Sequence, residues 1–434
     1  MIKTLILFII ALLVLFIIYA IFWATDLYYS TSAFVVQFGV VAIGLFTFII
    51  ITRYLLLLFF SMVKTIHKLG DGEKQTPTHH RVSIIVPAYN EDVVIGASIQ
   101  SLLKQTYRFV EIVVLDDGST DKTYSIAKSY EQDLGDKSVR VFTKPNGGKS
   151  RALNYGIEKS SGDLIMVVDA DSKLKEDAVE LLVRAFHDPD TAAVAGSVYV
   201  INRTNTLAKL QALEYIEGLN MVRNGQALLK MVNIIPDPIG VFRRSALEKV
   251  GGYDHDTFAE DCDLTLKLIA AGYKIDFEPD ALAYTEAPED LLDLIKQRYR
   301  WTRGILQAIR KHKEHLFSFR KSPSTSAILW YMLFEAIFWP FMDFWGSVFF
   351  IYLSLTTGLS MILIYWWSLF TVLDMAGAFY CLLITRDDLK LVFYALLYRL
   401  YFIGIINIAK IFATIEEWFN IEMSWGKLDR KGRL

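Results

Sequence analysis

Two aspartates stand two residues apart at the end of an apolar run. Asp169 and Asp171 follow residues 164–168, which read as a buried strand. Mg²⁺ takes one or two carboxylates and completes its octahedron with phosphate oxygens and water. Such a cation would neutralise the charge that develops on a nucleoside diphosphate leaving group. An acidic surface turn would look the same, and the aspartyl-phosphatase pattern is disfavoured because its fifth position here is Lys173.

Further polar groups follow another apolar run and open a helical stretch. Asp116 and Asp117 follow residues 111–115 and could accept hydrogen bonds from a base N–H and ribose hydroxyls, or simply form a turn capped by Ser119 or Thr120. Lys149 and Arg151 open a helical stretch after two glycines, where cations could hold a diphosphate or merely face solvent.

Two later motifs suggest the acceptor side of a transfer reaction. The carboxylate pair Glu260-Asp261 precedes an amphipathic stretch at 264–271, and one of its carboxylates could take a proton from an attacking hydroxyl. Capping of that helix is the alternative. Residues 297–301 read Gln-Arg-Tyr-Arg-Trp in a basic, amphipathic stretch. This motif could bind a sugar and a diphosphate, or it could anchor a helix at a membrane surface.

The segments between these motifs predict a layered α/β domain. Short apolar runs at 82–86, 111–115, 139–143 and 164–168 alternate with helical stretches at 94–105, 121–133 and 149–160. This alternation predicts a mostly parallel, Rossmann-like sheet covered on both faces. Ligands of such sheets bind beyond the carboxyl ends of the strands, where the acidic residues and Asn90 and Glu91 fall. No Gly-x-Gly-x-x-Gly is present, which disfavours a nicotinamide dinucleotide.

Composition indicates a membrane protein. The chain has 434 residues, is 53% hydrophobic, and has a mean hydropathy of +0.33. Its net charge of −2 gives no reason to expect nucleic acid as a partner. The two cysteines, Cys262 and Cys381, fit neither a disulfide framework nor a zinc site.

Apolar segments at both ends predict membrane crossings. Residues 4–25 and 27–52 are each long enough to span a bilayer, and the basic residues that follow place the central region in the cytosol. Residues 327–356, 359–385 and 391–413 return to membrane-like composition. Asp343, Asp374 and Arg399 within them either face a protein interior or lie near an interface. The basic tail at 427–433 favours a cytosolic end, whereas three full crossings would put it outside.

Taken in order, the motifs resemble the family 2 inverting glycosyltransferases. They comprise residues 86–91 with Pro87, Tyr89 and Glu91; Asp116-Asp117-Gly118-Ser119; residues 148–154 with Lys149 and Arg151; Asp169-Ala170-Asp171; Glu260-Asp261; and Gln297-x-x-Arg300-Trp301. The last motif narrows the resemblance to the processive synthases of cellulose, chitin, hyaluronan and poly-N-acetylglucosamine.

The resemblance implies a GT-A fold and a set of roles. Asp117 with Asp116 is expected to bind uridine, and Asp171 with Asp169 to bind Mg²⁺ or Mn²⁺ and the diphosphate. Asp261, beside Glu260, is expected to be the general base. Gln297, Arg300 and Trp301 are expected to hold the acceptor and the diphosphate, and Pro87, Tyr89, Glu91, Lys149 and Arg151 to line the substrate site.

The resemblance also implies an organisation and a substrate. We expect two membrane helices in residues 1–63, a cytosolic GT-A domain at 64–287, interface helices at 288–326, and membrane helices with a basic tail at 327–434. Residues 239–247 and Ala259-Glu260-Asp261 look most like the poly-β-1,6-N-acetylglucosamine synthases, which implies a UDP-sugar donor and a growing polysaccharide acceptor. The protein would lie in the cell membrane, and a small membrane accessory subunit is a further expected partner.

Three other interpretations stay open. The donor could be that of a hyaluronan, chitin or cellulose-type synthase. A non-processive transferase could act on a lipid-linked acceptor, although such enzymes usually lack the Gln-x-x-Arg-Trp motif. A transporter whose soluble domain only binds nucleotide would leave Asp261 and the 297–301 motif without a role.

Overall fold

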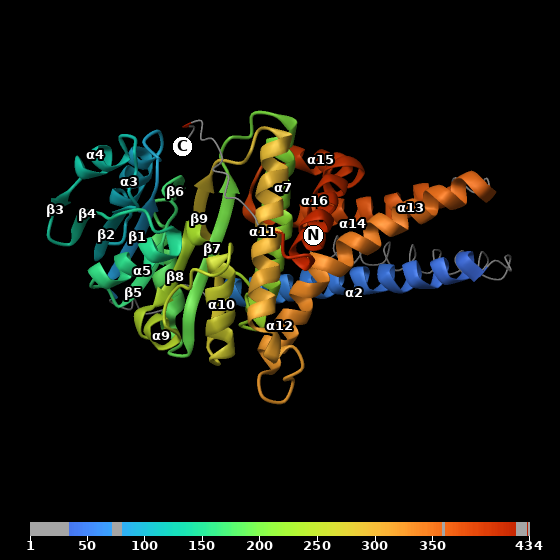
Figure 1. The fold of residues 1–434 in the computed structure, drawn as a ribbon, viewed down its shortest axis with the longest axis horizontal. Helices are drawn as coiled ribbons and strands as arrows, with labels where there is room; N and C mark the ends of the chain where they lie inside the picture. Colours follow the sequence, from blue (N-terminus) through green and yellow to red (C-terminus); the bar gives the residue numbers. More distant parts are fainter. Residues whose placement is uncertain (1–33, 72–79, 358–360, 422–431, 433–434) are drawn as a thin grey trace.

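The computed structural model describes residues 34–71, 80–357, 361–421 and 432. The predicted membrane segment at 4–25 and the basic residues of the tail lie outside these ranges. In Figure 1, a sheet domain occupies one end of the molecule and long helices extend from the other, with α7 (Thr206–Glu214) and α11 (Leu291–Lys311) between them.

A nine-stranded mixed sheet forms the centre of the domain, in the order β3-β4-β2-β1-β5-β8-β7-β9-β6. Its strands are β1 (Val82–Ala88), β2 (Val110–Asp116), β3 (Gln132–Asp133), β4 (Lys137–Thr143), β5 (Leu164–Val167), β6 (Ser172–Leu174), β7 (Thr191–Val200), β8 (Gly240–Arg243) and β9 (Lys274–Thr285). The four predicted strands are confirmed as β1, β2, β4 and β5, which pair in parallel.

The other half of the sheet departs from the mostly parallel prediction. Strand β8 pairs antiparallel with both β5 and β7, and β6 pairs antiparallel with β9. Strand β7 and β9 are parallel to each other. The chain between β7 and β8 includes a long helical excursion at residues 206–228, after which β8 enters the sheet between β5 and β7.

Helices cover both faces of the sheet, as predicted for strands that are apolar on both sides. Ile84 and Val86 of β1 pack in one core with α3 (Ile95–Leu103), α4 (Thr123–Lys128) and α6 (Ala178–Arg184). Ile85 faces the opposite core, with α5 (Lys149–Lys159), α9 (Arg244–Val250), α10 (Glu260–Ala270) and α12 (Pro323–Leu333). This alternation follows from the two-residue period of a strand.

One predicted helix is much shorter than expected. The stretch at 121–133 forms only α4, and its end turns back as β3 against β4. Neither Ser119 nor Thr120 caps α4; instead Oδ1 of Asp121 accepts the Thr123 N–H at 2.9 Å. The pairing of β3 with β4 competes with continuation of the helix. This pairing depends on residues beyond the 121–133 stretch, so the local sequence pattern does not predict it.

Within the described residues, four helical segments are long and apolar enough to cross a membrane: Val36–Lys68, Pro323–Thr356, Ile364–Thr385 and Leu389–Trp418. They are built from α2 (Phe34–Asp71); α12, η5 (Phe334–Phe338) and α13 (Trp339–Thr357); α14 (Met361–Thr385); and η6 (Leu389–Phe393), α15 (Tyr394–Leu397), η7 (Tyr398–Phe402) and α16 (Ile403–Trp418). The three predicted C-terminal membrane segments therefore coincide with helical segments.

The long helix α2 is tied directly to the sheet. Nζ of Lys64 lies 2.7 Å from Oδ1 of Asp276 in β9, and Lys68 bonds Glu278 and Asp280 of the same strand. The predicted domain boundary at residue 64 thus falls within a continuous helix. The remaining elements are η1 (Ala185–His187), η2 (Tyr215–Met221), α8 (Val222–Leu228), η3 (Asp237–Ile239) and η4 (Lys313–His315).

Candidate active site

A single cavity of about 1160 Å³ runs from the carboxyl ends of the parallel strands to the long apolar helices. All but one of the residues to which the resemblance assigns a role line it: Pro87, Tyr89, Glu91, Asp117, Lys149, Arg151, Asp169, Asp171, Glu260, Asp261, Gln297, Arg300 and Trp301. The fold therefore brings together motifs that are spread over about half of the chain.

The exception is Asp116, which is buried beside the cavity. Its Oδ2 accepts the Thr143 hydroxyl at 2.7 Å and its Oδ1 accepts the Ser119 N–H at 3.2 Å. These bonds hold the ends of β2 and β4 together. Asp116 therefore supports the loop that carries Asp117, and its role in uridine binding stays a prediction.

Asp117 organises the loop before α5. Its Oδ2 accepts the Gly148 N–H at 2.8 Å, and Lys144 also bonds its carboxylate. Gly118 makes this turn possible, because its φ of +75° is left-handed and an added Cβ would lie 2.8 Å from the Asn146 nitrogen. Asp117 thus places the start of α5, and with it Lys149, at the cavity wall.

Lys149 lies among three carboxylates from three different segments. Its Nζ is 2.7 Å from Oδ1 of Asp169, 2.7 Å from Oδ2 of Asp237 and 3.3 Å from Oε1 of Glu260. Burial by itself would lower the pKa of the Lys149 ammonium, but the three carboxylates outweigh burial and raise the pKa well above its ordinary value. Lys149 is therefore a permanent cation in the cavity.

Asp169 and Asp171 provide the oxygen donors that the sequence predicted. Both side chains line the cavity next to Lys149, and Asp171 is buried. An all-carboxylate donor set that leaves room for phosphate and water suits Mg²⁺ or Mn²⁺. The residues present therefore fit a divalent cation. Asp169, one of the two carboxylates that would hold it, also pairs with Lys149.

Asp261 begins α10 together with Glu260. Oδ1 of Asp261 accepts the Cys262 N–H at 2.7 Å. Burial, followed by the neighbouring Glu260 carboxylate, raises the pKa of Asp261 to about 6. A carboxylate with a pKa near neutrality can take up a proton during a reaction more readily than an ordinary one.

A buried arginine, Arg223, also lines the cavity. Burial lowers the pKa of Arg223 to about 10, with Asp261 acting against this shift. Among the described residues, its Nη1 has no hydrogen-bond partner. Arg223 belongs to α8, which continues from the π-helical turn η2.

Helix α11 presents the Gln-Arg-Tyr-Arg-Trp motif to the cavity. The guanidinium of Arg298 lies 4.1 Å from the centre of the Trp301 ring, and its Nη2 lies 2.5 Å from Oε2 of Glu214. Within the described part of the chain, Nε and Nη1 of Arg298 and Oε1 of Gln297 have no hydrogen-bond partner. These atoms are available to a polar ligand beside an aromatic face.

The far end of the cavity is polar although apolar helices form it. Arg399 of η7 makes a double hydrogen bond to Asp374 of α14, at 2.8 and 3.1 Å. Asn407 of α16 donates to Asp343 of α13 at 2.8 Å. Of the two sequence interpretations for the ionisable residues, the interior-facing one is confirmed for Asp343, Asp374 and Arg399, all of which are buried.

Sequence reasoning missed several polar residues of the cavity, among them Asp237, Arg223, Glu214 and Arg298. The Pro236-Asp237-Pro238 tripeptide was a usable signal, because two prolines fix a carboxylate in a rigid loop. Glu214 and Arg223 lie in a helix whose polar residues gave no periodic signal. Arg298 lies within the Gln297–Trp301 motif, in which only Gln297, Arg300 and Trp301 were assigned roles.

Comparison with known proteins agrees with this geometry. Residues 83–251 match the family model described as "Glycosyl transferase family 2". This part of the chain is therefore similar to the family 2 glycosyltransferases. The matched residues include Asp117, Asp171 and Asp237.

Curated relatives are similar over about half of the chain. The chain is 34% identical over 224 residues to poly-β-1,6-N-acetyl-D-glucosamine synthase of Staphylococcus aureus strain COL, covering 51% of this chain and 54% of the relative. It is 32% identical over 244 residues to the synthase of the same name from Staphylococcus epidermidis, covering 56% and 57%. The chain thus spans about half the length of the curated relatives it matches.

A solved structure supports the fold. The mannosyltransferase PcManGT from Pyrobaculum calidifontis, solved with GDP-Man and Mn²⁺, superposes with a TM-score of 0.57 at 20% identity. The match covers 84% of this chain and all of that chain. The predicted GT-A-like, Rossmann-related fold is thereby confirmed.

Proposed function

We propose that this protein is a membrane polysaccharide synthase that transfers N-acetylglucosamine from UDP-N-acetylglucosamine to a growing β-linked polymer, with inversion at the anomeric carbon. One observation carries the proposal. A single cavity connects the Lys149 carboxylate cluster, the Trp301 platform and the long apolar helices. The choice of sugar rests on the names of the relatives and on the sequence motifs.

In the proposed reaction, the acceptor hydroxyl attacks the anomeric carbon on the face opposite the diphosphate. The new carbon–oxygen bond forms as the bond to the diphosphate oxygen breaks, and the diphosphate leaves with the electron pair. Asp261 takes the hydroxyl proton, for which its raised pKa suits it. Lys149 and Arg151 face the departing diphosphate, and Trp301 stacks on the acceptor sugar.

Asp171 and Asp169 would hold Mg²⁺ or Mn²⁺ against the diphosphate. When bound, the cation supplies positive charge that neutralises the leaving group. Lys149 adds a fixed positive charge on the same side, since its pKa is raised by its three carboxylates. Asp117 with Asp116 would bind the uridine, and Pro87, Tyr89 and Glu91 would line the donor site.

The polar far end of the cavity supports export of the product through the membrane helices. Arg399, Asp374 and Asn407 line it and offer hydrogen-bonding groups to a hydrated sugar chain. We place the helices in the cell membrane and the sheet domain in the cytosol, since the basic residues that follow the first apolar segments lie on the domain side.

The test is a donor-dependent synthesis assay. The full-length protein in lipid vesicles is incubated with Mg²⁺ or Mn²⁺ and UDP-N-acetylglucosamine, and both UDP release and product length are measured. UDP release with long polymer supports the proposal, and both should stop with EDTA. Activity with a different UDP-sugar would reject the choice of sugar, and short products only would reject processive synthesis by this chain alone.

A further inference from the structure

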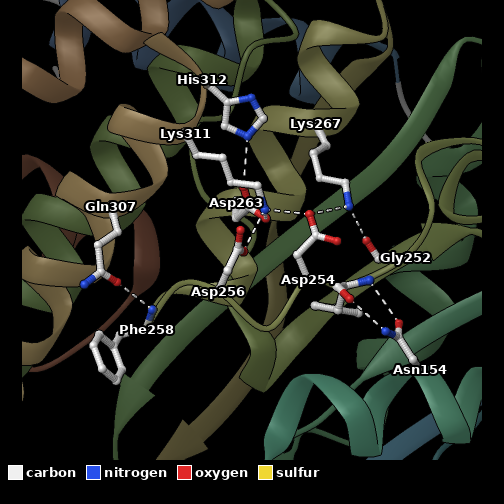
Figure 2. Close-up of polar contacts among 11 residues, drawn as sticks. Asn154, Gly252, Asp254, Asp256, Phe258, Asp263, Lys267, Gln307, Lys311 and His312 are labelled. Atoms are coloured by element: carbon white, nitrogen blue, oxygen red, sulfur yellow. Dashed lines mark hydrogen bonds and ion pairs between the residues drawn. The ribbon is translucent and has the colours of Figure 1, made fainter. Parts of the chain in front are cut away.

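The second half of α11 packs against the segment that leads into Asp261. Gly304, Gln307, Lys311 and His312 recur at a spacing of three to four residues or adjoin one another, so they share one side of the helix. Each of them lies against residues between Asp254 and Asp263. Figure 2 shows the contacts of Gln307, Lys311 and His312. The first half of the same helix carries the Gln297–Trp301 motif.

Lys311 is the centre of these contacts. Its Nζ lies 2.6 Å from Oδ2 of Asp254, 2.8 Å from Oδ1 of Asp256 and 2.9 Å from Oδ2 of Asp263. His312 completes the group, with Nε2 2.9 Å from Oδ1 of Asp263. Figure 2 shows the three carboxylates converging on the Lys311 amine from the loop and from α10.

The ammonium of Lys311 compensates a strong repulsion. Oxygen atoms of Asp254, Asp256 and Asp263 lie within 4.8 Å of one another, close enough to hold a cation. Burial opposes ionisation of Asp263, but the bonds from His312 and Lys311 outweigh it and keep the pKa of this carboxyl low. Bonds from Lys311 and Lys267 likewise outweigh burial and keep the pKa of Asp254 low. Removing Lys311 would leave three closely spaced carboxyl groups without the ammonium that they share.

Two direct contacts with α11 hold the residues that immediately precede Asp261. Oε1 of Gln307 accepts the Phe258 N–H at 3.0 Å. At Gly304, an added Cβ would lie 2.6 Å from Cβ of Ala259, so the helix and this loop touch without a side chain between them. Ala259 immediately precedes Glu260 and Asp261, so the position of the base follows that of α11.

The start of the segment is held from the donor side. Asn154 of α5 bonds both the N–H and the C=O of Tyr253, at 2.9 and 2.7 Å. Lys267 of α10 donates to the Gly252 carbonyl at 2.7 Å. The segment is thus fixed at one end to the helix that begins with Lys149 and at the other end to the acceptor helix.

We propose that Lys311 is a positioning residue for the transfer reaction: it clamps the 254–263 segment to α11, so that Asp261 and the Gln297–Trp301 motif move as one unit. This inference rests on the proposed function. Lys311 does not touch substrate; it acts by fixing the distance between the base and the acceptor hydroxyl. A displacement of that base by about 1 Å is enough to cost on the order of 100-fold in rate.

The experiment compares Lys311→Met, Lys311→Arg and the control Lys313→Met in the full-length protein in lipid vesicles. Lys313 is exposed on the turn that follows α11. We expect Lys311→Met to lower kcat for UDP release on the order of 100-fold. The donor KM and the affinity for UDP should stay at wild-type values, Lys311→Arg should recover most of kcat, and Lys313→Met should match wild type.

Hydrogen exchange gives a readout that does not need turnover. Amides in residues 252–262, the Phe258 N–H included, should exchange faster in Lys311→Met, while those of β1 and β5 stay protected. Unchanged kcat and unchanged exchange would overturn the proposal. Loss of UDP binding together with kcat would also overturn it, because Lys311 would then support the whole domain.

A second variant separates the clamp from a general loss of folding. Gln307→Met removes the bond to Phe258 but leaves the three carboxylates paired with Lys311. It should lower kcat less than Lys311→Met and leave UDP binding intact; wild-type kcat in Gln307→Met would count against the clamp. If the wild-type protein transfers no sugar from any donor, the proposed function fails, whereas the exchange measurement still tests whether Lys311 holds the segment.

Discussion

Nζ of Lys149 lies 2.7 Å from Oδ2 of Asp237, a buried carboxylate in the loop before β8. Within the described residues, the other oxygen of Asp237 has no hydrogen-bond partner. Burial raises the pKa of Asp237 well above its ordinary value, and Lys149 opposes this rise. Lys149 therefore favours the charged form of Asp237, and Asp237 helps to hold Lys149 in position.

The first prediction concerns this pair. Asp237→Asn should lower kcat/KM for the UDP-sugar by about tenfold, because a charge-assisted hydrogen bond that orients Lys149 is lost. Steady-state UDP release measures the effect. Asp190→Asn is a matched control, since Asp190 is exposed and pairs with Lys274 at the surface. An unchanged kcat/KM for Asp237→Asn would show that Asp169 and Glu260 suffice to hold Lys149.

The pH dependence follows from Asp261. Because the base must be deprotonated and its pKa is about 6, kcat should fall as the pH drops through 6, well above the ordinary aspartate range. Glu260 is one of the groups that raise this pKa. In Glu260→Gln the acid limb should therefore move to lower pH. A limb that stays in place, measured from pH 5 to 8 with saturating donor, would argue that another group titrates.

Stacking of Arg298 on Trp301 predicts an effect on the acceptor. Replacing Arg298 by Met removes a cation–π contact worth about 1 kcal/mol, roughly a fivefold change in affinity. We expect weaker binding of chito-oligosaccharides or related acceptors and shorter products, with UDP binding unchanged. Lys296→Met, on the exposed side of the same helix, should leave product length unchanged. Equal product lengths in both variants would remove Arg298 from the acceptor site.

Close contact at Gly304 predicts sensitivity to the smallest side chain. Gly304→Ala should destabilise the protein by about 1–3 kcal/mol, since its methyl group would overlap Ala259. It should also lower kcat, because relief of the clash moves the loop before Asp261. Gly404→Ala in α16 is the control, since an added Cβ there meets nothing within 4 Å. Thermal unfolding in detergent, together with UDP release, distinguishes the two variants.

Pairing of Asp374 with Arg399 predicts coupling between the long helices. Asp374→Asn leaves Arg399 buried, with the more distant Asp343 at 3.7 Å, and should cost about 3–5 kcal/mol. Removing both partners, in Asp374→Asn with Arg399→Met, should recover part of that loss, because no unpaired charge remains. Thermal unfolding of the single and double variants measures this. A double variant less stable than the single one would contradict the argument.

What the sequence alone determined was local. Apolar runs ended by acidic residues predicted β1, β2, β4 and β5 and the side of the sheet where Asp117 and Asp171 meet. This works because strand burial and the position of ligands at strand ends follow from a repeating, short-range pattern. The motifs around Lys149 and Trp301 could also be recognised from short-range sequence patterns.

Only the tertiary structure decided the partners. Nothing in the local pattern around Asp237 indicates that it meets Lys149, and nothing around Lys311 indicates three carboxylates from another helix and loop. The antiparallel half of the sheet and the short α4 were also misjudged, since strand pairing depends on segments far away in the chain. Ion pairs and close helix contacts depend on how the elements pack. That packing also joins the segment before Asp261 to α11.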